Sequence, residues 1–272
     1  MQQASILLRE AKIAAPEREA LWLIEAVTGA SAATVKAGVG VNEQDCKRAM
    51  ELARRRVAGE PLQYLTGVSG FRKLELRVGR GAFIPRPETE LLVERALTRL
   101  PLDGVIVDVG TGSGAIALAA AQERRDARVY ATEASHSALR WARLNRRRLD
   151  LAVELVSGDL LDGLSQDLKG RIDVVVSNPP YVSLADSSFL PSDVRDHEPH
   201  EALFAGPVGL EVIEHLAAEA WEWLTPGGWL VLEIGATQGP AVVAELARRG
   251  YDEVSVHRDL AGRPRMAEGR HP

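Results

Sequence analysis

Apolar residues recur with two different spacings along the chain, which divides it into a helical first part and a longer second part. Residues 1–80 carry the three-to-four-residue spacing of helices that bury one face. The predicted helices are Ile6–Ile13, Glu17–Val27 and Glu43–Ala58. Asn42 is placed to cap the third helix, and Gly29 and Gly59 stand where the second and third should end. The first part therefore predicts a small helical domain.

A short alternating segment follows these helices. Phe71–Val78 alternates apolar and charged residues, which is typical of a half-buried strand, and Gly79–Gly81 has the composition of a turn. We expect a hairpin here that links two domains. The predicted boundaries are 1–68 for the helical domain, 69–83 for the hairpin linker and 84–272 for the remaining domain.

From about Leu102 the pattern changes to short apolar strands separated by helical stretches. The predicted strands are Val105–Val109, Arg128–Thr132, Val153–Val156, Asp173–Ser177, Trp229–Ile234 and Val254–His257. Such alternation is typical of right-handed βαβ units. We therefore predict a doubly wound α/β domain with a mostly parallel sheet. Leu184–His200, rich in Ser, Asp and Pro, predicts a long mobile loop.

Composition and charge limit the kinds of partner that this protein can bind. Of the 272 residues 46% are apolar and 26% are charged, so the chain can bury a large core. The net charge of −5 divides into +4 over residues 1–80, where 13 Lys/Arg face 9 Asp/Glu, and −9 over residues 81–272. Proteins that grip nucleic acid unaided usually show a strong basic face. The charge therefore predicts no stable nucleic-acid binding.

The single cysteine and the N-terminal residues bear on the compartment. Cys46 is alone, so no internal disulfide is possible, and with the six histidines it forms no convincing metal cluster. Residues 1–5 lack the basic and apolar segments of a signal peptide, and no stretch approaches the ~20 apolar residues of a membrane span. We expect a cytoplasmic protein without a metal.

Three alternate glycines follow the first strand of the second domain. Glycines let the backbone approach a ligand closely, and the next helix offers unpaired N–H groups. The third glycine comes one residue earlier than in the dinucleotide fingerprint, and a carboxylate at Asp108 repels a pyrophosphate but suits the ammonium and sulfonium of S-adenosylmethionine. A plain strand-to-helix turn is the alternative. The predicted contacts with S-adenosylmethionine are Asp108, Gly110, Thr111, Gly112, Ser113 and Gly114.

Two further predicted cofactor contacts follow the next strands. Glu133 ends the second strand, 19 residues beyond Gly114, where a carboxylate can accept hydrogen bonds from two ribose hydroxyls. Asp159 and Leu160 follow the third strand and offer a carboxylate and an apolar contact for adenine. A solvated acid at position 133 and a surface loop at 159–160 are the alternatives.

The fourth strand ends in the tetrapeptide Asn178-Pro179-Pro180-Tyr181, at the edge where open α/β sheets bind ligands. Pro179 and Pro180 remove two backbone donors and restrict the loop. The Asn178 side-chain oxygen and a Pro179 carbonyl can accept both hydrogens of a planar NH₂ group, on which Tyr181 can stack. The tetrapeptide therefore predicts methylation of an amide or aromatic amino nitrogen.

The expected reaction is an in-line displacement that depends on positioning and needs no strong base. Asn178, Pro179 and Tyr181 are the predicted catalytic residues. All four residues of the tetrapeptide, Pro180 included, are predicted to bind the substrate, and Asn178 is also predicted to contact the cofactor.

These features together resemble the release factor glutamine methyltransferases over nearly the whole chain. Besides the motifs above, the matching segments are Arg55–Arg56, Gly59–Pro61, Tyr64–Gly67, Ile84–Glu90, Glu198–Pro199, Ala202–Leu203, Gly209–Leu210, Pro226–Gly228, Glu233–Gly235 and Asp259–Arg263. The resemblance implies a class I S-adenosylmethionine methyltransferase fold with a seven-stranded sheet. It also implies N5-methylation of the glutamine in the Gly-Gly-Gln motif of class I peptide chain release factors, which the N-terminal helices would help to recognise.

The resemblance also implies roles for single residues. Gly110–Gly114, Glu133, Leu160 and Asn178 would contact the cofactor, and Asn178–Tyr181 the glutamine. The chain departs from the family at two of these positions, because position 133 is commonly Asp and position 160 can be aromatic. We expect a monomer.

Two other functions fit the motifs. An adenine-amino DNA or RNA methyltransferase can hold a flipped adenine with the same tetrapeptide, but the acidic charge and the lack of an evident target-recognition domain argue against it. A non-catalytic binding module with the same fold is the second alternative, against which the intact Asn178, Tyr181 and glycine loop argue.

Overall fold

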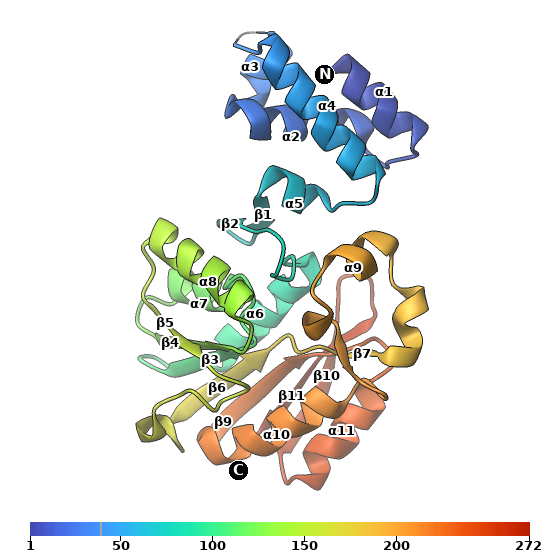
Figure 1. Cartoon of the computed structure of the whole chain (residues 1–272). Helices are drawn as coiled ribbons and strands as arrows, with labels where there is room; N and C mark the ends of the chain where they lie inside the picture. Colours follow the sequence, from blue (N-terminus) through green and yellow to red (C-terminus); the bar gives the residue numbers. More distant parts are fainter. Residues whose placement is uncertain (39) are drawn as a thin grey trace. The chain divides into compact units, whose positions relative to one another are not determined.

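The computed structural model describes residues 1–38 and 40–272. The chain folds into two compact units, coloured along the sequence in Figure 1. The smaller unit comprises Met1–Ser69, Val78–Arg80 and Pro191–His197, and the larger comprises Gly70–Arg77, Gly81–Leu190 and Glu198–Pro272. In the described part of the chain, no helix combines the length and apolar character needed to cross a membrane.

The smaller unit is helical, as predicted. Its first five helices are α1 (Gln2–Glu10), α2 (Pro16–Thr28), α3 (Ala32–Lys36), α4 (Glu43–Val57) and α5 (Leu62–Thr66). They bury a core that includes Leu8, Leu23 and Leu65. The predicted cap of α4 is confirmed, because the Asn42 side chain accepts a hydrogen bond from the Asp45 N–H at 2.9 Å. In return, the Asp45 carboxylate accepts a hydrogen bond from the Asn42 N–H at 3.2 Å.

One predicted helix of this unit has different ends, and two short helices were not predicted. The first helix begins at Gln2 rather than Ile6 and ends before Lys12, which has a left-handed φ of 60°. Apolar spacing alone did not reveal its polar first turn. The short helices α3 and α5 were not predicted, because five residues are too few to show a helical period.

The predicted hairpin is present and is formed by β1 (Val68–Phe71) and β2 (Leu74–Arg77), but the single strand predicted at Phe71–Val78 covers the end of β1, the turn and all of β2. Arg72 occupies the turn with a φ of 50°. Its N–H donates to the Glu90 carboxylate at 2.8 Å, and its guanidinium forms two hydrogen bonds with the Glu123 carboxylate. These distant partners hold the turn, which is why local alternation missed it.

The larger unit is built on a seven-stranded sheet in the order β10-β11-β9-β6-β3-β4-β5. Its strands are β3 (Val105–Val109), β4 (Arg128–Glu133), β5 (Val153–Ser157), β6 (Ile172–Ser177), β9 (Leu224–Glu233), β10 (Asp252–Arg258) and β11 (Pro264–Arg270). Only β11 runs antiparallel to its neighbours; the other pairings are parallel. The prediction of a doubly wound, mostly parallel sheet is confirmed.

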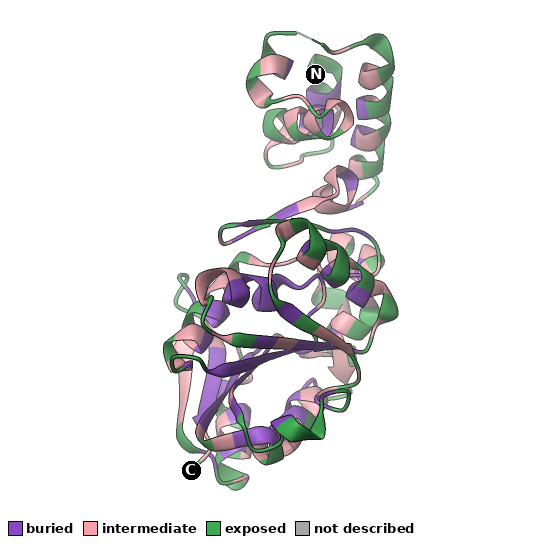
Figure 2. Ribbon diagram, turned by 90° about the vertical axis from the view of Figure 1, so that its left-hand side faces the viewer, coloured by how far each residue is buried: buried purple, intermediate pink, exposed green. Residues whose placement is uncertain are grey.

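Helices cover both faces of this sheet (Figure 1). They are α6 (Pro87–Arg99), α7 (Ala115–Glu123), α8 (His136–Leu149), α10 (Glu211–Trp223) and α11 (Gly239–Arg248). The last two pack on one face, where their apolar residues join Val105, Val107 and Val109 in a single core. The other three lie on the opposite face. The central strands are therefore buried on both sides, as Figure 2 shows in purple.

The carboxyl ends of four strands lie level with one another. Val109 of β3 pairs with Thr132 of β4 and with Ser177 of β6, which in turn pairs with Leu232 of β9. The chain runs from β3 to β4 and β5 on one side, then returns to β6 on the other side of β3. This reversal creates the crevice where such sheets bind ligands. The residues that follow these four positions form the candidate site.

Strand β11 was not found from the apolar pattern because it carries three charged residues. One of them, Glu268, is fully buried and bonds to Arg95 and Arg99 of α6 and to His257 of β10. Burial opposes ionisation, but these partners together lower the pKa of Glu268 to about 2. Ion pairs with α6 and β10 therefore allow a strand that contains charged residues to lie inside the sheet.

The prediction of a long loop at Leu184–His200 was wrong. The segment after β7 (Val182–Ser183) contains the 3₁₀ helix η2 (Leu184–Phe189) and the helix α9 (Ser192–His197), followed by η3 (His200–Ala202) and β8 (Phe204–Gly206). Ser183 caps η2, because its hydroxyl oxygen accepts a hydrogen bond from the Asp186 N–H at 3.2 Å. Asp186 and Asp193, two of the residues that suggested a loop, lie instead in the first turns of η2 and α9. A further 3₁₀ helix, η1 (Gln166–Leu168), precedes β6.

Candidate active site

The three glycines after β3 have left-handed φ angles of 71°, 61° and 90°. A Cβ added to Gly110 or Gly112 would meet nothing within 4 Å, so the backbone of both residues borders open space. A Cβ on Gly114 would lie 2.8 Å from Leu118 Cδ1. The first two glycines therefore leave the loop accessible to a ligand, whereas the third lets α7 pack.

Asp108 is fully buried and braces this loop. Its Oδ2 accepts hydrogen bonds from the Thr111 hydroxyl at 2.5 Å and from the Ala117 N–H in the first turn of α7 at 3.0 Å. Burial raises the pKa of Asp108 to about 7, although these two bonds oppose the shift. Among the described atoms its Oδ1 has no partner, and neither does the buried Ser113 hydroxyl.

Glu133 ends β4 and joins the glycine loop to the start of α8. Its two carboxylate oxygens accept hydrogen bonds from the N–H groups of Gly112 at 2.7 Å and Ser135 at 2.8 Å. Burial raises the pKa of this carboxyl against the effect of both bonds. Each oxygen has a second lone pair, so the carboxylate keeps the capacity to accept two ribose hydroxyls.

The segment after β5 lies against Glu133, whose carbonyl accepts a hydrogen bond from the Gly158 N–H at 3.2 Å. Asp159 is exposed, whereas Leu160 is half-buried and packs against the core of the sheet with a left-handed φ of 45°. This loop is held in place at its next residue, because the Leu161 N–H donates to Glu219 of α10 at 3.2 Å. An apolar side chain thus lies two residues beyond the backbone contact with Glu133.

The tetrapeptide after β6 is held from both of its ends. Ser177, just before it, donates from its hydroxyl to the Val109 carbonyl at 2.7 Å, which ties the end of β6 to the start of the glycine loop. Pro179 is buried, and Asn178, Pro180 and Tyr181 are half-buried. The glycine loop and the tetrapeptide therefore lie on adjacent strand ends, as the parallel register requires.

Three residues outside the predicted site contact the tetrapeptide. The Asn178 side-chain amide donates to the Thr89 hydroxyl at 3.2 Å, and the Tyr181 hydroxyl donates to Glu233 at 3.4 Å. Gln238 donates to the Tyr181 and Gly209 carbonyls, both at 2.9 Å.

Sequence reasoning missed Thr89, Glu233 and Gln238 as part of the site. Glu233 did carry a signal, because it is an acid at the end of an apolar buried strand, the same situation that marked Glu133. Thr89 carried only its membership of the matching segment Ile84–Glu90, and Gln238 carried no signal, since both reach the tetrapeptide only through the packing of α6 and of the turn before α11.

These observations fit a bound S-adenosylmethionine. The accessible glycine backbone, the partially satisfied Glu133 carboxylate and the unpartnered Asp108 Oδ1 and Ser113 hydroxyl lie on one loop and the strand ends beside it. Unsatisfied buried polar atoms are costly without a partner, so Asp108 Oδ1 and the Ser113 hydroxyl, together with the open backbone of Gly110 and Gly112, support a binding site for a polar molecule.

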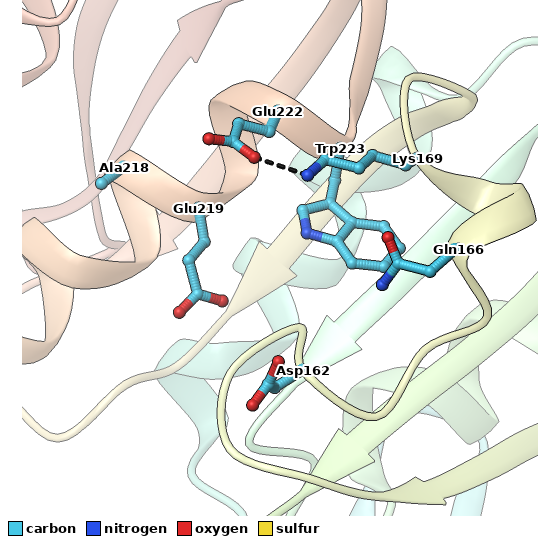
Figure 3. A pocket seen from close by; sticks show the side chains of 7 residues that line it. All are labelled: Asp162, Gln166, Lys169, Ala218, Glu219, Glu222 and Trp223. Atoms are coloured by element: carbon cyan, nitrogen blue, oxygen red, sulfur yellow. Dashed lines mark ion pairs between the residues drawn. The ribbon is translucent and has the colours of Figure 1, made fainter.

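A separate polar pocket of about 340 Å³ lies along α10, and Figure 3 shows its lining. The lining residues are Asp162, Gln166, Lys169, Ala218, Glu219, Glu222 and Trp223. None of them belongs to the glycine loop or the tetrapeptide. Lys169 and Glu222 pair across the pocket at 2.6 Å, so its charge is partly satisfied internally. The chemistry predicted from the sequence therefore lies elsewhere, at the carboxyl ends of the strands.

Two parts of the chain match models of known protein families. Residues 87–190 match the family model of the methyltransferase small domain, and residues 1–67 match that of the PrmC N-terminal domain. The fold is that of an S-adenosylmethionine-dependent methyltransferase. More particularly, the chain belongs to the release factor glutamine methyltransferase family, as its sequence predicted.

Relatives from distant bacteria support this assignment over nearly the whole chain. The release factor glutamine methyltransferase of Salmonella typhimurium is 40% identical over 94% of this chain and 92% of its own length. That of Deinococcus radiodurans is 39% identical over 99% and 96%, and that of Streptomyces coelicolor is 45% identical over 82% and 80%.

Solved structures share the fold at low sequence identity. A methyltransferase from Pyrococcus furiosus is 22% identical, with a TM-score of 0.56 over 73% of this chain and 89% of its own. The 16S rRNA N2 G1207 methyltransferase of Thermus thermophilus, solved with AdoMet and guanosine, is 18% identical, with a TM-score of 0.55 over 75% and 50%. At these identities the likeness extends to the fold alone, which confirms the predicted class I methyltransferase architecture.

Proposed function

We propose that this protein transfers a methyl group from S-adenosylmethionine to the side-chain nitrogen of the glutamine in the Gly-Gly-Gln motif of class I peptide chain release factors. The observation that carries the proposal is the position of Asn178–Tyr181, on the strand end next to the glycine loop and tied to it through Ser177. The named activity of the family members supports glutamine over adenine as the acceptor.

The residues that would hold the cofactor are those brought together after β3, β4 and β5. When bound, S-adenosylmethionine supplies an electrophilic methyl group. Glu133 would accept the ribose hydroxyls, Asp159 and Leu160 would border the adenine, and Asn178 would close the site beside the methyl group. Gly110–Gly114, including Thr111 and Ser113, would line the amino acid portion, with Asp108 Oδ1 as the nearest free acceptor.

The tetrapeptide would bind the acceptor amide. The Asn178 Oδ1 and the Pro179 carbonyl would accept its two N–H hydrogens and hold the nitrogen in line with the methyl group. Tyr181 would pack on the flat amide, and Pro180 would limit movement of the loop. Burial and the neighbouring Glu233 raise the pKa of Tyr181 to about 12, so its hydroxyl stays protonated and neutral.

The N-terminal residues would recognise the protein substrate. We propose that residues 1–68 form the recognition domain, that 69–83 link it to the rest and that 84–272 form the catalytic domain. The match of residues 1–67 to the PrmC N-terminal domain supports this division. We further propose that the protein works as a monomer in the cytoplasm.

Incubation with methyl-labelled cofactor and a purified release factor tests the activity. We expect one label per release factor, located by mass spectrometry on the Gly-Gly-Gln glutamine. A release factor in which that glutamine is replaced by alanine should accept none. Label that persists on the variant, or that appears on a DNA or RNA oligonucleotide instead, would contradict the proposal.

Glu133→Gln should weaken cofactor binding roughly tenfold to a hundredfold, the cost of losing hydrogen bonds to a charged acceptor. A carboxamide has one acceptor oxygen, so it leaves either the Gly112 or the Ser135 N–H facing an NH₂ group. Calorimetric titration with S-adenosylmethionine measures the effect. Glu154→Gln on β5, which is exposed, serves as the matched control. An unchanged affinity in Glu133→Gln would remove this residue from the cofactor site.

A further inference from the structure

A chain of hydrogen bonds leads away from the catalytic amide into the protein. The Asn178 Nδ2 donates to the Thr89 hydroxyl oxygen at 3.2 Å, and that hydroxyl donates to Glu233 Oε2 at 2.7 Å. The other oxygen of Glu233 accepts from the Tyr181 hydroxyl at 3.4 Å. Glu233 therefore connects both ends of the tetrapeptide.

The residues of this hydrogen-bond chain lie at the ends of three separate elements, which the fold places side by side. Thr89 lies in the first turn of α6, Asn178 directly follows β6, and Glu233 is the last residue of β9, which pairs with β6. Thr89 is 4% exposed and Glu233 is 3% exposed, so water does not compete for the bond between them. Buried polar groups of this kind are ordered because every alternative leaves an atom unsatisfied.

The direction of the hydrogen bonds follows from what each group can donate. An ionised carboxylate only accepts, so Thr89 must give its single proton to Glu233. The Thr89 oxygen is then left as an acceptor and requires a donor from Asn178. Only the NH₂ side of the carboxamide provides one. If the amide were turned over, two oxygens without a proton between them would face each other at 3.2 Å.

The groups around Glu233 determine the pH at which its carboxylate becomes protonated, and below that pH the direction of the hydrogen bonds is no longer fixed. Burial raises the pKa of Glu233 and Glu88 of α6 adds to the rise, whereas the hydroxyls of Thr89 and Tyr181 and the charge of Arg265 on β11 oppose it. A protonated Glu233 could donate to Thr89, which would then be free to donate towards Asn178.

We propose that Thr89 and the ionised Glu233 are positioning residues that fix the Asn178 carboxamide with its Oδ1 directed to the acceptor nitrogen. The inference rests on the proposed function, because it assumes that Asn178 binds an NH₂ group. Neither residue touches the substrate. The effect of Thr89 on methyl transfer passes through Asn178, so it should disappear when the Asn178 side chain is absent, whereas Glu233 also contacts the Tyr181 hydroxyl.

A double-mutant cycle tests this dependence. Thr89→Val keeps the shape of the side chain but removes the hydroxyl, and we expect turnover to fall roughly tenfold to a hundredfold, as for the loss of one preorganised transition-state contact or somewhat less. Cofactor affinity measured by calorimetry should stay unchanged. Thr89→Ser, which retains the hydroxyl, should recover most of the activity. In an Asn178→Ala background Thr89→Val should cost nothing further.

Glu233→Gln provides a second test that does not rely on removing Thr89. A carboxamide at position 233 can donate a hydrogen bond to the Thr89 oxygen, so it no longer fixes the direction of the hydrogen bond between Thr89 and Asn178. Its turnover should be low at every pH, and it should lack the acid decline that we expect protonation of Glu233 to cause in the parent protein.

A spectroscopic measurement separates this inference from the proposed activity. In protein labelled with ¹⁵N-asparagine, the Asn178 side-chain NH₂ signals, identified by their loss in Asn178→Ala, should shift in Thr89→Val and return in Thr89→Ser. If the parent protein fails to methylate release factors but the signals behave this way, the proposed function falls and the positioning role stands. If the parent is active while Thr89→Val is equally active, or if Thr89→Val and Asn178→Ala have additive effects, the inference is wrong.

Discussion

Asn178→Ala is expected to lower the turnover number for methyl transfer by roughly a hundredfold to a thousandfold, the usual cost of removing one preorganised hydrogen-bonding group from a transition state. The alanine cannot accept a hydrogen bond from the acceptor NH₂ group, so the nitrogen is no longer held in line with the methyl group. Single-turnover kinetics with labelled cofactor and a release factor measure the change.

The same variant should bind the cofactor almost as well as the parent protein. The glycine loop and Glu133 are held by their own backbone contacts and do not depend on the Asn178 side chain. Calorimetric titration checks this, with Gln166→Ala as a matched control that removes an exposed carboxamide from η1. Equal losses of turnover and cofactor affinity would contradict the role assigned to Asn178.

Glu268→Ala should destabilise the protein by about 3–5 kcal/mol, the usual cost of removing one partner from a buried ionic cluster. The substitution leaves the guanidinium groups of Arg95 and Arg99 facing a cavity without their counter-charge. Urea denaturation followed by circular dichroism measures the loss. Glu222→Gln, which alters an exposed pair with Lys169, should leave stability nearly unchanged.

The pH dependence of stability gives a second measure of the same carboxylate. Its pKa is depressed from 4.5 in the unfolded chain to about 2 in the fold, so its stabilising contribution is complete above about pH 5. That contribution should disappear as pH falls through the folded pKa, between roughly pH 5 and pH 2. The parent protein should lose more stability than Glu268→Ala across this window. Parallel curves for the two proteins would show that Glu268 is not the group responsible.

The order of elements in the catalytic part of the chain could be predicted because each central strand is buried on both faces. Such strands are short, continuous apolar runs, and the glycines and helices between them are equally local signals. The strand β11 could not be predicted in this way. Its buried Glu268 is stable only beside Arg95 and Arg99, which lie far away in the sequence.

The hairpin was predicted, but the position of its turn and the helices at 184–200 were missed for related reasons. The turn at Arg72 depends on Glu90 and Glu123, and no local pattern reports a distant carboxylate. The Ser and Pro residues of Leu184–His200 are common to loops and to the first turns of short helices, so composition alone cannot separate the two.

The sequence by itself determined the class of the protein. The G-x-G-x-G loop, the acid after the second strand and Asn178–Tyr181 are contiguous motifs whose chemistry depends on residue type and spacing, and the matching segments over nearly the whole chain specified the family. The tertiary structure alone decided what holds these motifs in place. Thr89, Asn178 and Glu233 are separated by 89 and 55 residues along the chain, and they meet only because parallel strands align their carboxyl ends and α6 packs beside them. A hydrogen bond acts over about 3 Å, so its partners are set by the fold and not by the local sequence.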